Sequence, residues 1–143
     1  MDTPACYRKL KSYKYQLMEE FHYRTDFELD EDVEIEFVKL GKEGLLTIAK
    51  YYSWDGASGP TYDSLNSMRA SLVHDALYQL MRKKKLSQDY VLPVDQLFKK
   101  MLVKDGMSSF RAWYWYQGLR LAAGKHAQPH NDKEDKIICV GKI

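Results

Sequence analysis

The spacing of the apolar residues changes near residue 54, and this change limits the chain to a mixed fold. Before it, apolar and polar residues alternate, so that Val33, Ile35 and Phe37 fall on one face. A period of two is typical of a half-buried β-strand. After it, apolar residues recur every three or four positions, as in amphipathic helices. We therefore predict an α+β domain whose N-terminal antiparallel β-meander packs on three helices.

The length of the chain favours a single domain. A chain of 143 residues is long enough to bury a self-supporting core. The predicted parts are an N-terminal arm (1–12), the β-meander (13–53), a loop followed by three helices (54–124) and a polar tail (125–143). Within the meander we predict strands at 13–17, 21–24, 33–37 and 45–52, with a turn at 41–44.

The helices are predicted from their apolar stripes and end signals, at 65–82, at 94–103 and from Ser108 or Ser109 to 123. On the third helix the predicted apolar stripe consists of Phe110, Trp113, Tyr114, Gln117 and Leu121. Trp115 falls away from this stripe, and we predict that it packs against the sheet. The alternative is exposure, which would indicate a surface for a partner or for lipid.

Charge and composition exclude several classes of protein. The net charge is only +2, which gives no strong electrostatic signal for nucleic acid or for an anionic membrane. No apolar run approaches the roughly 20 residues needed to cross a bilayer, and the start of the chain lacks a signal peptide. Cys6 and Cys139 are too few for a disulfide scaffold. The basic run 82–85 is interpreted as the end of a helix, with a phosphate or lipid-headgroup patch as the alternative.

A group of titratable residues lies within the predicted helices. His74 and Tyr78 are four residues apart, so a helix places them on one side, opposite its main apolar stripe. Imidazole titrates near neutral pH, which makes His74 the predicted general base. Asp95, on the next helix, is predicted to orient His74, and Tyr78 to donate a hydrogen bond to Asp95. We expect these three residues to be catalytic.

A calcium site is predicted beside this group. Asp75 follows His74 directly and points to one side of it, where its carboxylate is available to a hard cation. Calcium takes six to eight oxygen ligands, many of them backbone carbonyls. Asp55 could add a second carboxylate, and the loop at Trp54 and Gly56 could add carbonyls. A bound cation would polarise an ester carbonyl and stabilise the oxyanion.

Four sequence segments carry a resemblance to a known family. They are Asp-Gly-Ala-Ser-Gly-Pro (55–60), His-Asp-Ala-Leu-Tyr (74–78), Val-Asp-Gln-Leu-Phe (94–98) and Arg-Ala-Trp-Tyr (111–114). Over about 13–124 the chain resembles a family of small, uncharacterised phage and prophage proteins. This resemblance implies a viral or mobile-element origin and a place in the host cytoplasm or the virion. It implies no settled activity.

Residues 54–102 show a second, weaker resemblance, to prokaryotic phospholipase A₂. The matching features are the His-Asp-x-x-Tyr unit, the glycine-containing loop before it and the helical aspartate after it. The resemblance implies a phospholipase A₂-like helix pair, with His74 as base, Asp75 as calcium ligand, Tyr78 as support and Asp95 as partner of the histidine. This sequence departs from that family in having no cysteines near the site and no secretion signal.

Two functions therefore remain open. The first is calcium-dependent hydrolysis of an ester, such as a phospholipid. The second is a non-catalytic viral accessory or virion protein that binds a host or particle component. In the second case His74 and Asp75 are a structural pair, and Asp95 is an acid in the first turn of its helix. His126 and His130 are interpreted as surface residues rather than metal ligands, because Pro129 argues against a helix there.

Overall fold

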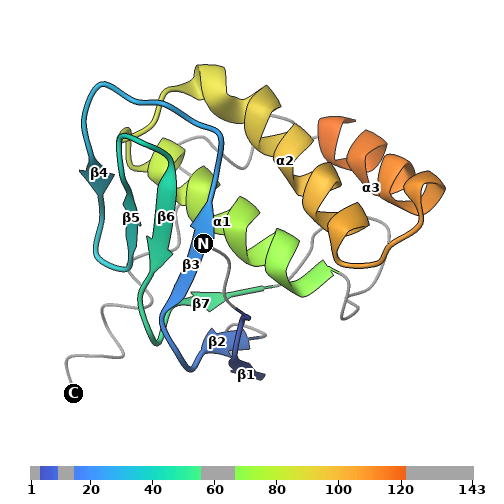
Figure 1. Ribbon diagram of the computed structural model, residues 1–143, viewed down its shortest axis with the longest axis horizontal. Helices are drawn as coiled ribbons and strands as arrows, with labels where there is room; N and C mark the ends of the chain where they lie inside the picture. Colours follow the sequence, from blue (N-terminus) through green and yellow to red (C-terminus); the bar gives the residue numbers. More distant parts are fainter. Residues whose placement is uncertain (1–3, 10–14, 56–66, 122–143) are drawn as a thin grey trace.

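The computed structural model describes residues 4–9, 15–55 and 67–121, and the fold of these residues is α+β (Figure 1). Antiparallel strands in two small sheets come first, and three packed helices follow. The strands are β1 (Tyr7–Lys9), β2 (Tyr15–Leu17), β3 (Phe21–Arg24), β4 (Val33–Glu34), β5 (Val38–Leu40), β6 (Leu45–Ile48) and β7 (Ser53–Trp54). The helices are α1 (Met68–Arg82), the short 3-10 helix η2 (Gln88–Tyr90), α2 (Val91–Lys104) and α3 (Ser109–Leu121).

The larger sheet has the strand order β3-β6-β5-β4, with every neighbouring pair antiparallel. Alternation places the side chains of every second cross-strand pair in the core. Phe21 pairs with Ile48 and both are buried, whereas His22 and Thr47, the next pair along, are on the other face. The period of two predicted for 21–24 is confirmed in β3, and burial also alternates in β5 and β6.

The predicted strand at 33–37 is wrong, because the chain reverses within it. β4 ends at Glu34 and β5 begins at Val38, and the Ile35 backbone N–H donates to the Val38 carbonyl over 2.8 Å. The sequence carries a trace of this turn. Phe37 and Val38 are adjacent apolar residues, and they shift the alternation by one position.

The turn at 41–44 is confirmed, and Gly44 shows why it needs glycine. The Gly44 N–H donates to the Gly41 carbonyl over 2.9 Å, and Gly44 has a φ of 97°. A Cβ at this position would lie 2.6 Å from the Phe27 carbonyl oxygen. Both the backbone angle and the close approach exclude other side chains.

The single predicted meander is instead divided into two sheets. The predicted strand at 45–52 ends at Ile48, and β7 pairs with β2 to form a smaller sheet of order β1-β2-β7. Tyr51 lies at the bend with a φ of 78°, and its N–H donates to the Leu17 carbonyl. A left-handed residue redirects the chain, which alternation alone cannot predict. β1 lies within the predicted N-terminal arm.

The predicted end of the first helix and start of the third are confirmed, but α2 begins at Val91, three residues before its predicted start at 94. The Ser108 hydroxyl accepts a hydrogen bond from the Arg111 N–H over 3.2 Å, as expected of the residue that caps α3. Pro93 lies in the first turn of α2, where its missing N–H has no intrahelical partner to lose. The predicted start of the first helix at Leu65 lies outside the described residues, as do His126, His130 and Cys139.

The first helix, α1, is central, with twelve of its fifteen residues buried. In Figure 1 it passes behind the larger sheet, and α2 packs on it from the other side. Trp54 connects the smaller sheet to α1, because its indole N–H donates to the Ser71 hydroxyl over 3.1 Å. Residues on the α2-facing side of α1 are therefore enclosed as well as those facing the sheet.

The face of α3 that was predicted to be its apolar stripe points away from the protein. Ala112, Trp115 and Leu119 are buried instead, and Trp115 stacks on Phe98 of α2 with ring centroids 6.3 Å apart. Trp115 therefore packs on a helix and not on the sheet. Both faces of α3 are apolar, so the pattern alone could not show which one is covered. Within the described part of the chain, no helix combines the length and the apolar character needed to span a membrane.

Candidate active site

Helix α1 presents His74 and Tyr78 toward α2 from successive turns. Both side chains are nearly enclosed, with 7% of His74 and 2% of Tyr78 exposed. Their ring centroids lie 4.0 Å apart, and the ring of Phe98 on α2 meets the imidazole edge-on at 5.2 Å. Packing on two sides holds the imidazole in one orientation.

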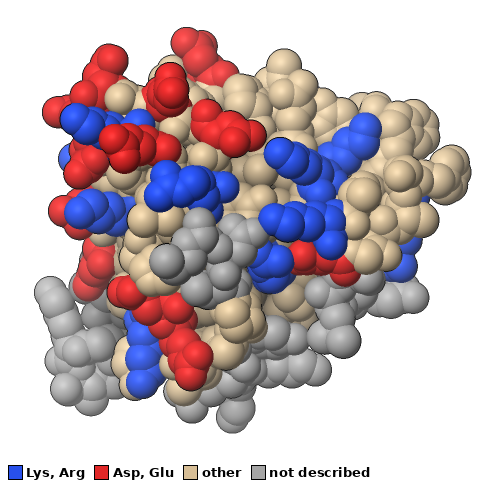
Figure 2. All heavy atoms as spheres, in the orientation of Figure 1, with Lys and Arg blue, Asp and Glu red and all other residues tan. Residues whose placement is uncertain are grey.

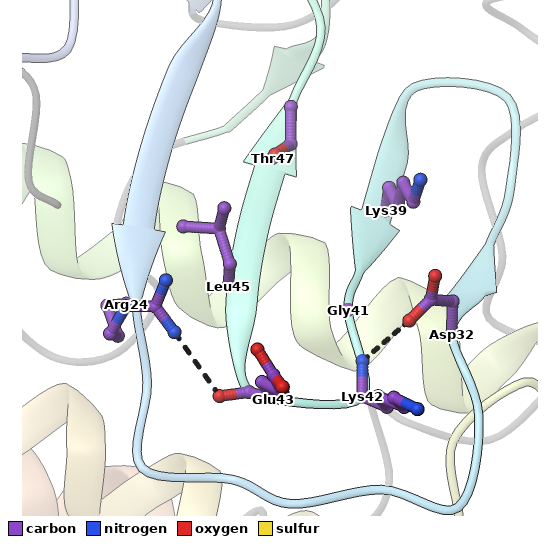
Figure 3. A pocket seen from close by; sticks show the side chains of 8 residues that line it. All are labelled: Arg24, Asp32, Lys39, Gly41, Lys42, Glu43, Leu45 and Thr47. Carbon is purple, nitrogen blue, oxygen red and sulfur yellow. Dashed lines mark hydrogen bonds between the residues drawn. The ribbon is translucent and has the colours of Figure 1, made fainter.

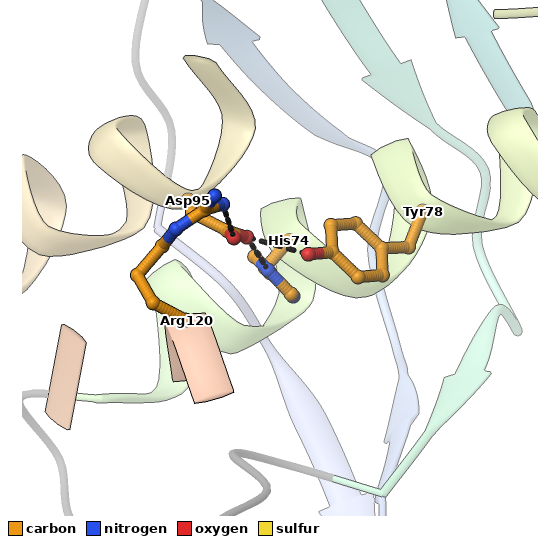
Figure 4. Close-up of polar contacts among 4 residues, drawn as sticks. All are labelled: His74, Tyr78, Asp95 and Arg120. Atoms are coloured by element: carbon orange, nitrogen blue, oxygen red, sulfur yellow. Dashed lines mark hydrogen bonds and ion pairs between the residues drawn. The ribbon is translucent and has the colours of Figure 1, made fainter. Parts of the chain in front are cut away.

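Asp95 is the centre of the site and accepts hydrogen bonds from three side chains (Figure 4). Its Oδ1 atom lies 2.8 Å from Nε2 of His74 and 2.6 Å from the hydroxyl of Tyr78. Its Oδ2 atom lies 2.6 Å from Nη1 of Arg120 on α3. One carboxylate thus joins all three helices.

Burial explains why Asp95 needs these partners. The residue has no exposed surface, and a charge removed from water is destabilising unless it is paired and hydrogen-bonded. Arg120 supplies the opposite charge, and about a third of its side chain stays exposed (31%). Asp95 also lies beyond the first turn of α2, which begins at Val91. The side chains around Asp95, more than the helix dipole, therefore stabilise its charge.

The hydrogen bonds fix which nitrogen of His74 carries the proton. A carboxylate only accepts hydrogen bonds, so Nε2 of His74 must be the donor to Asp95. Neutral His74 then has its lone pair on Nδ1. If the imidazole takes up a second proton, the buried carboxylate beside it stabilises the imidazolium that forms.

Tyr78 remains protonated in this environment. Burial raises the pKa of its phenol well above the ordinary value, and the hydrogen bond to Asp95 and the charge of that carboxylate raise it further. Tyr78 is therefore a fixed donor to Asp95 across the ordinary pH range, which is the supporting role expected from the sequence.

The predicted calcium ligands are brought together only in part. Asp75 lies on α1 and Asp55 directly after β7, and both are half-buried. Trp54 is buried with its indole on Ser71, and Ser71 and Asp75 share one face of α1 because they are four residues apart. The end of β7 therefore lies against the face of α1 that carries Asp75.

The fourth predicted metal ligand belongs to the loop that follows Asp55. Gly56 lies outside the described residues, as does the rest of the loop to residue 66. Among residues 4–9, 15–55 and 67–121, no three His, Cys, Asp or Glu side chains form a group that could hold a metal. Two carboxylates and a neighbouring loop are hard oxygen donors of the kind that calcium prefers, and any further ligands would be backbone carbonyls.

Arg120 is a member of the cluster around Asp95 that the sequence interpretation missed. Two features of the sequence could have identified Arg120. An aspartate on the buried side of a helix requires a cation, and Arg120 directly follows Leu119, which is buried. With Phe110 and Trp113 assigned to the inner face of α3, Arg120 fell outside the predicted site.

The hollow of the larger sheet is separate from this site (Figure 3). It has a volume of about 380 Å³ and is lined by Arg24, Asp32, Lys39, Gly41, Lys42, Glu43, Leu45 and Thr47. Its polar groups bind nearby backbone: Asp32 accepts from the Lys42 N–H over 2.8 Å, and Arg24 donates to the Glu43 carbonyl over 3.4 Å. These contacts stabilise the turn between β5 and β6.

Comparison with known proteins gives a family but no activity. Residues 15–119 match the model of a family described as a protein of unknown function (DUF1353). A search of curated proteins and a search of solved structures returned no match. The matched residues include His74, Tyr78 and Asp95 and end just before Arg120. The match covers most of the chain, which therefore belongs to the uncharacterised DUF1353 family.

Proposed function

We propose that this protein is a hydrolase that cleaves an ester bond, with phospholipid as the substrate class and His74 as the general base. The observation that supports this most strongly is the Asp95 carboxylate, which is fully buried and holds Nε2 of His74 at 2.8 Å. A histidine oriented by a buried aspartate is the arrangement that activates water or a hydroxyl for attack on a carbonyl.

The proposed reaction uses the chain's own groups as follows. Nδ1 of His74 takes a proton from water while the water oxygen attacks the ester carbonyl. Asp95 stabilises the imidazolium, and Arg120 and Tyr78 hold Asp95 in place. The C–O bond to the alcohol then breaks, and the imidazolium returns the proton to the leaving oxygen. The products are a carboxylic acid and an alcohol.

Calcium is the proposed cofactor, held by Asp75 with Asp55 and the backbone carbonyls of Trp54 and Gly56. When bound there it would polarise the ester carbonyl and stabilise the charge on its oxygen. The contact between Trp54 and Ser71 supports this assignment, because it brings the start of the loop to the face of α1 that carries Asp75. Calorimetric titration should detect calcium binding in the wild type and none in Asp75→Asn.

The test of the hydrolase is a measurement of fatty-acid release from dispersed phospholipid in the presence of calcium. His74→Gln keeps an amide N–H that can donate to Asp95 but has no basic nitrogen. We expect it to lose activity by about 10²–10⁴-fold, the usual contribution of a general base. Tyr51→Phe, whose side chain is 47% exposed in the sheet half of the protein, serves as the control. Undiminished release by His74→Gln would refute the assignment of the base.

A non-catalytic role is the second proposal, and one observation favours it. Both oxygens of Asp95 have partners, and the cluster joins α1, α2 and α3, as a purely structural network would. In that case the protein is a viral accessory or virion protein that binds a host or particle component, in keeping with the phage resemblance of the sequence. Unfolding separates the two proposals. A large loss of stability in His74→Ala that is much smaller in His74→Gln, with no hydrolysis by the wild type, supports the structural role.

A further inference from the structure

The outer face of α3 is apolar and uncharged although it lies at the surface. Phe110 and Leu121 are 76% and 88% exposed, and Trp113 and Tyr114 are each about half exposed (47% and 48%). With Gln117 these residues fall within one arc of about 100° around the helix. We call these five residues the outer face of α3. The rings of Phe110 and Trp113 stack at 6.2 Å, so the face presents a continuous aromatic surface.

The opposite side of the same helix is apolar as well, because Ala112, Trp115 and Leu119 pack on α2. A helix that is apolar all round is normally enclosed by protein or in contact with lipid. Of residues 4–9, 15–55 and 67–121, those that pack on α3 cover one side of it. A cluster of exposed large apolar residues indicates a surface that binds something.

Charge is divided between the two halves of the chain. Residues 15–55 contain four Lys and Arg and eleven Asp and Glu, whereas residues 67–121 contain ten Lys and Arg and four Asp. The net charge of +2 conceals this division. Figure 2 shows acidic residues gathered at the sheet end, and Lys and Arg between that end and the uncharged surface over α3. On α3 itself, Arg111 and Arg120 lie at the two edges of the outer face.

We propose that the outer face of α3 docks on an anionic phospholipid bilayer. Tryptophan and tyrosine prefer the boundary between headgroups and acyl chains, where one part of each ring is apolar and the other polar. Arg111 at one edge of the face and the other basic side chains of the helical half would attract anionic headgroups, whereas Arg120 at the opposite edge is paired with Asp95. The acidic sheet half would be directed away from the headgroups. The identity of the lipid rests on the proposed hydrolase function.

A nucleic acid fits this face less well. Proteins that bind single strands combine aromatic rings with a cationic groove along the backbone path. Here the cations lie at the edges, and the centre contains Leu121 and Phe110, which offer no hydrogen bond. A bilayer also accounts for the position of the site, because α3 supplies Arg120 to Asp95. One helix would then both meet the lipid and hold the proposed catalytic cluster.

Tryptophan fluorescence tests the docking directly. The chain has three tryptophans, and Trp54 and Trp115 are buried, so Trp113 is the one that a membrane can reach. We expect its emission to shift to shorter wavelength when vesicles of mixed phosphatidylglycerol and phosphatidylcholine are added. The shift should be absent in Trp113→Phe, while sedimentation with the vesicles persists. Raising the salt to about 1 M shortens the screening length to about 3 Å and should weaken binding.

A matched pair of variants locates the surface. Phe110→Ser should lower the partition onto these vesicles about tenfold, a loss equal to about 1.4 kcal/mol. Tyr51→Ser is the control, since Tyr51 is 47% exposed but lies in the acidic half of the protein. Equal partition of the two variants would overturn the proposal. Absence of vesicle binding by the wild type would also overturn it, as would capture of a single-stranded oligonucleotide or an acidic protein instead of vesicles.

The docking and the hydrolysis can fail separately. A water-soluble, short-chain phospholipid presents the same ester without a bilayer. Hydrolysis of that substrate without vesicle binding would reject the docking surface and leave the hydrolase intact. Vesicle binding that depends on Phe110, with neither substrate hydrolysed, would reject the hydrolase and leave the docking surface intact.

Discussion

Two polar clusters in this protein contain the same kinds of side chain and differ in burial. Around Asp95, an aspartate is fully enclosed and paired with Arg120 on another helix. In the hollow of the larger sheet, Asp32 and Arg24 are exposed, and each binds backbone at the neighbouring turn. Water solvates the charges of Asp32 and Arg24, so they do not need a partner of opposite charge. The Asp95 cluster is shielded from water and depends on its partner side chains. Of the two clusters, it is the one whose charged groups are held in the fixed geometry that a catalytic site requires.

The strongest test of this comparison removes the aspartate from each cluster. Asp95→Ala leaves Arg120 without its partner and takes an acceptor from His74 and Tyr78. We expect it to lower the free energy of unfolding by about 3–5 kcal/mol, the usual effect of breaking a buried ion pair. Asp32→Ala removes one exposed hydrogen bond and should have an effect of about 1 kcal/mol or less. Urea unfolding of both variants gives the comparison, and equal losses would contradict it.

The arginines give a second, smaller contrast. Arg120→Met keeps most of the apolar stem but removes the charge that faces Asp95. We expect a loss of about 2 kcal/mol, less than for Asp95 because water reaches part of the Arg120 side chain. Arg24→Met should change stability by no more than about 0.5 kcal/mol. Thermal unfolding followed by circular dichroism compares the two. A loss in Arg24→Met as large as in Arg120→Met would show that burial is not the deciding factor.

The raised pKa of Tyr78 predicts a dependence on alkaline pH. Above about pH 10 the unfolded chain loses its phenolic protons, whereas Tyr78 in the folded protein keeps its own. The folded state then binds more protons at this residue, so stability is complete below pH 10 and falls as the pH rises beyond it. The loss should reach about 1.4 kcal/mol per pH unit from this residue.

Other tyrosines titrate in the same range, so the quantity to measure is a difference. The free energy of unfolding should fall more steeply between pH 10 and 11 in the wild type than in Tyr78→Phe. Parallel curves for the two proteins would be inconsistent with a protonated, buried Tyr78.

The smallest expected effect is that of the hydroxyl of Tyr78 at neutral pH. Tyr78→Phe removes one hydrogen bond to Asp95 and leaves the ring packing unchanged. We expect a loss of about 1 kcal/mol, because Asp95 keeps two other donors. Tyr114→Phe removes an exposed hydroxyl and should leave stability within about 0.5 kcal/mol of the wild type. Chemical denaturation under identical buffer conditions measures both, and a larger loss for Tyr114→Phe would reverse the assignment.

The fold class could be predicted because the spacing of apolar residues within a short segment distinguishes strands from helices. The change from a period of two to a helical period identified strands and helices, and Ser108 marked the start of the third helix. The errors share one physical cause. The chain reverses between β4 and β5 and bends at Tyr51. Its direction there depends on backbone angles, about which the alternation of apolar residues carries little information.

The site was predicted in part for a related reason. His74 and Tyr78 are one turn apart on a helix, so their neighbourhood follows from spacing alone. The contact of Asp95 with His74 and Tyr78 depends on how α2 packs on α1. It was predicted from the residue types and from the resemblance to phospholipase A₂. Arg120 depends on which of the two apolar faces of α3 is covered. On the covered face Trp115 stacks on Phe98 of α2, a contact between two helices that no local pattern contains.

The central claim is that Asp95 holds His74 with its proton on Nε2 and its lone pair on Nδ1. Nitrogen-15 NMR of protein labelled at histidine measures this directly, with His74→Gln assigning the signal among the four histidines. We predict that neutral His74 shows a protonated Nε2 and an unprotonated Nδ1, and that Asp95→Ala removes this preference. A neutral His74 protonated on Nδ1, or a tautomer unchanged in Asp95→Ala, would contradict the account.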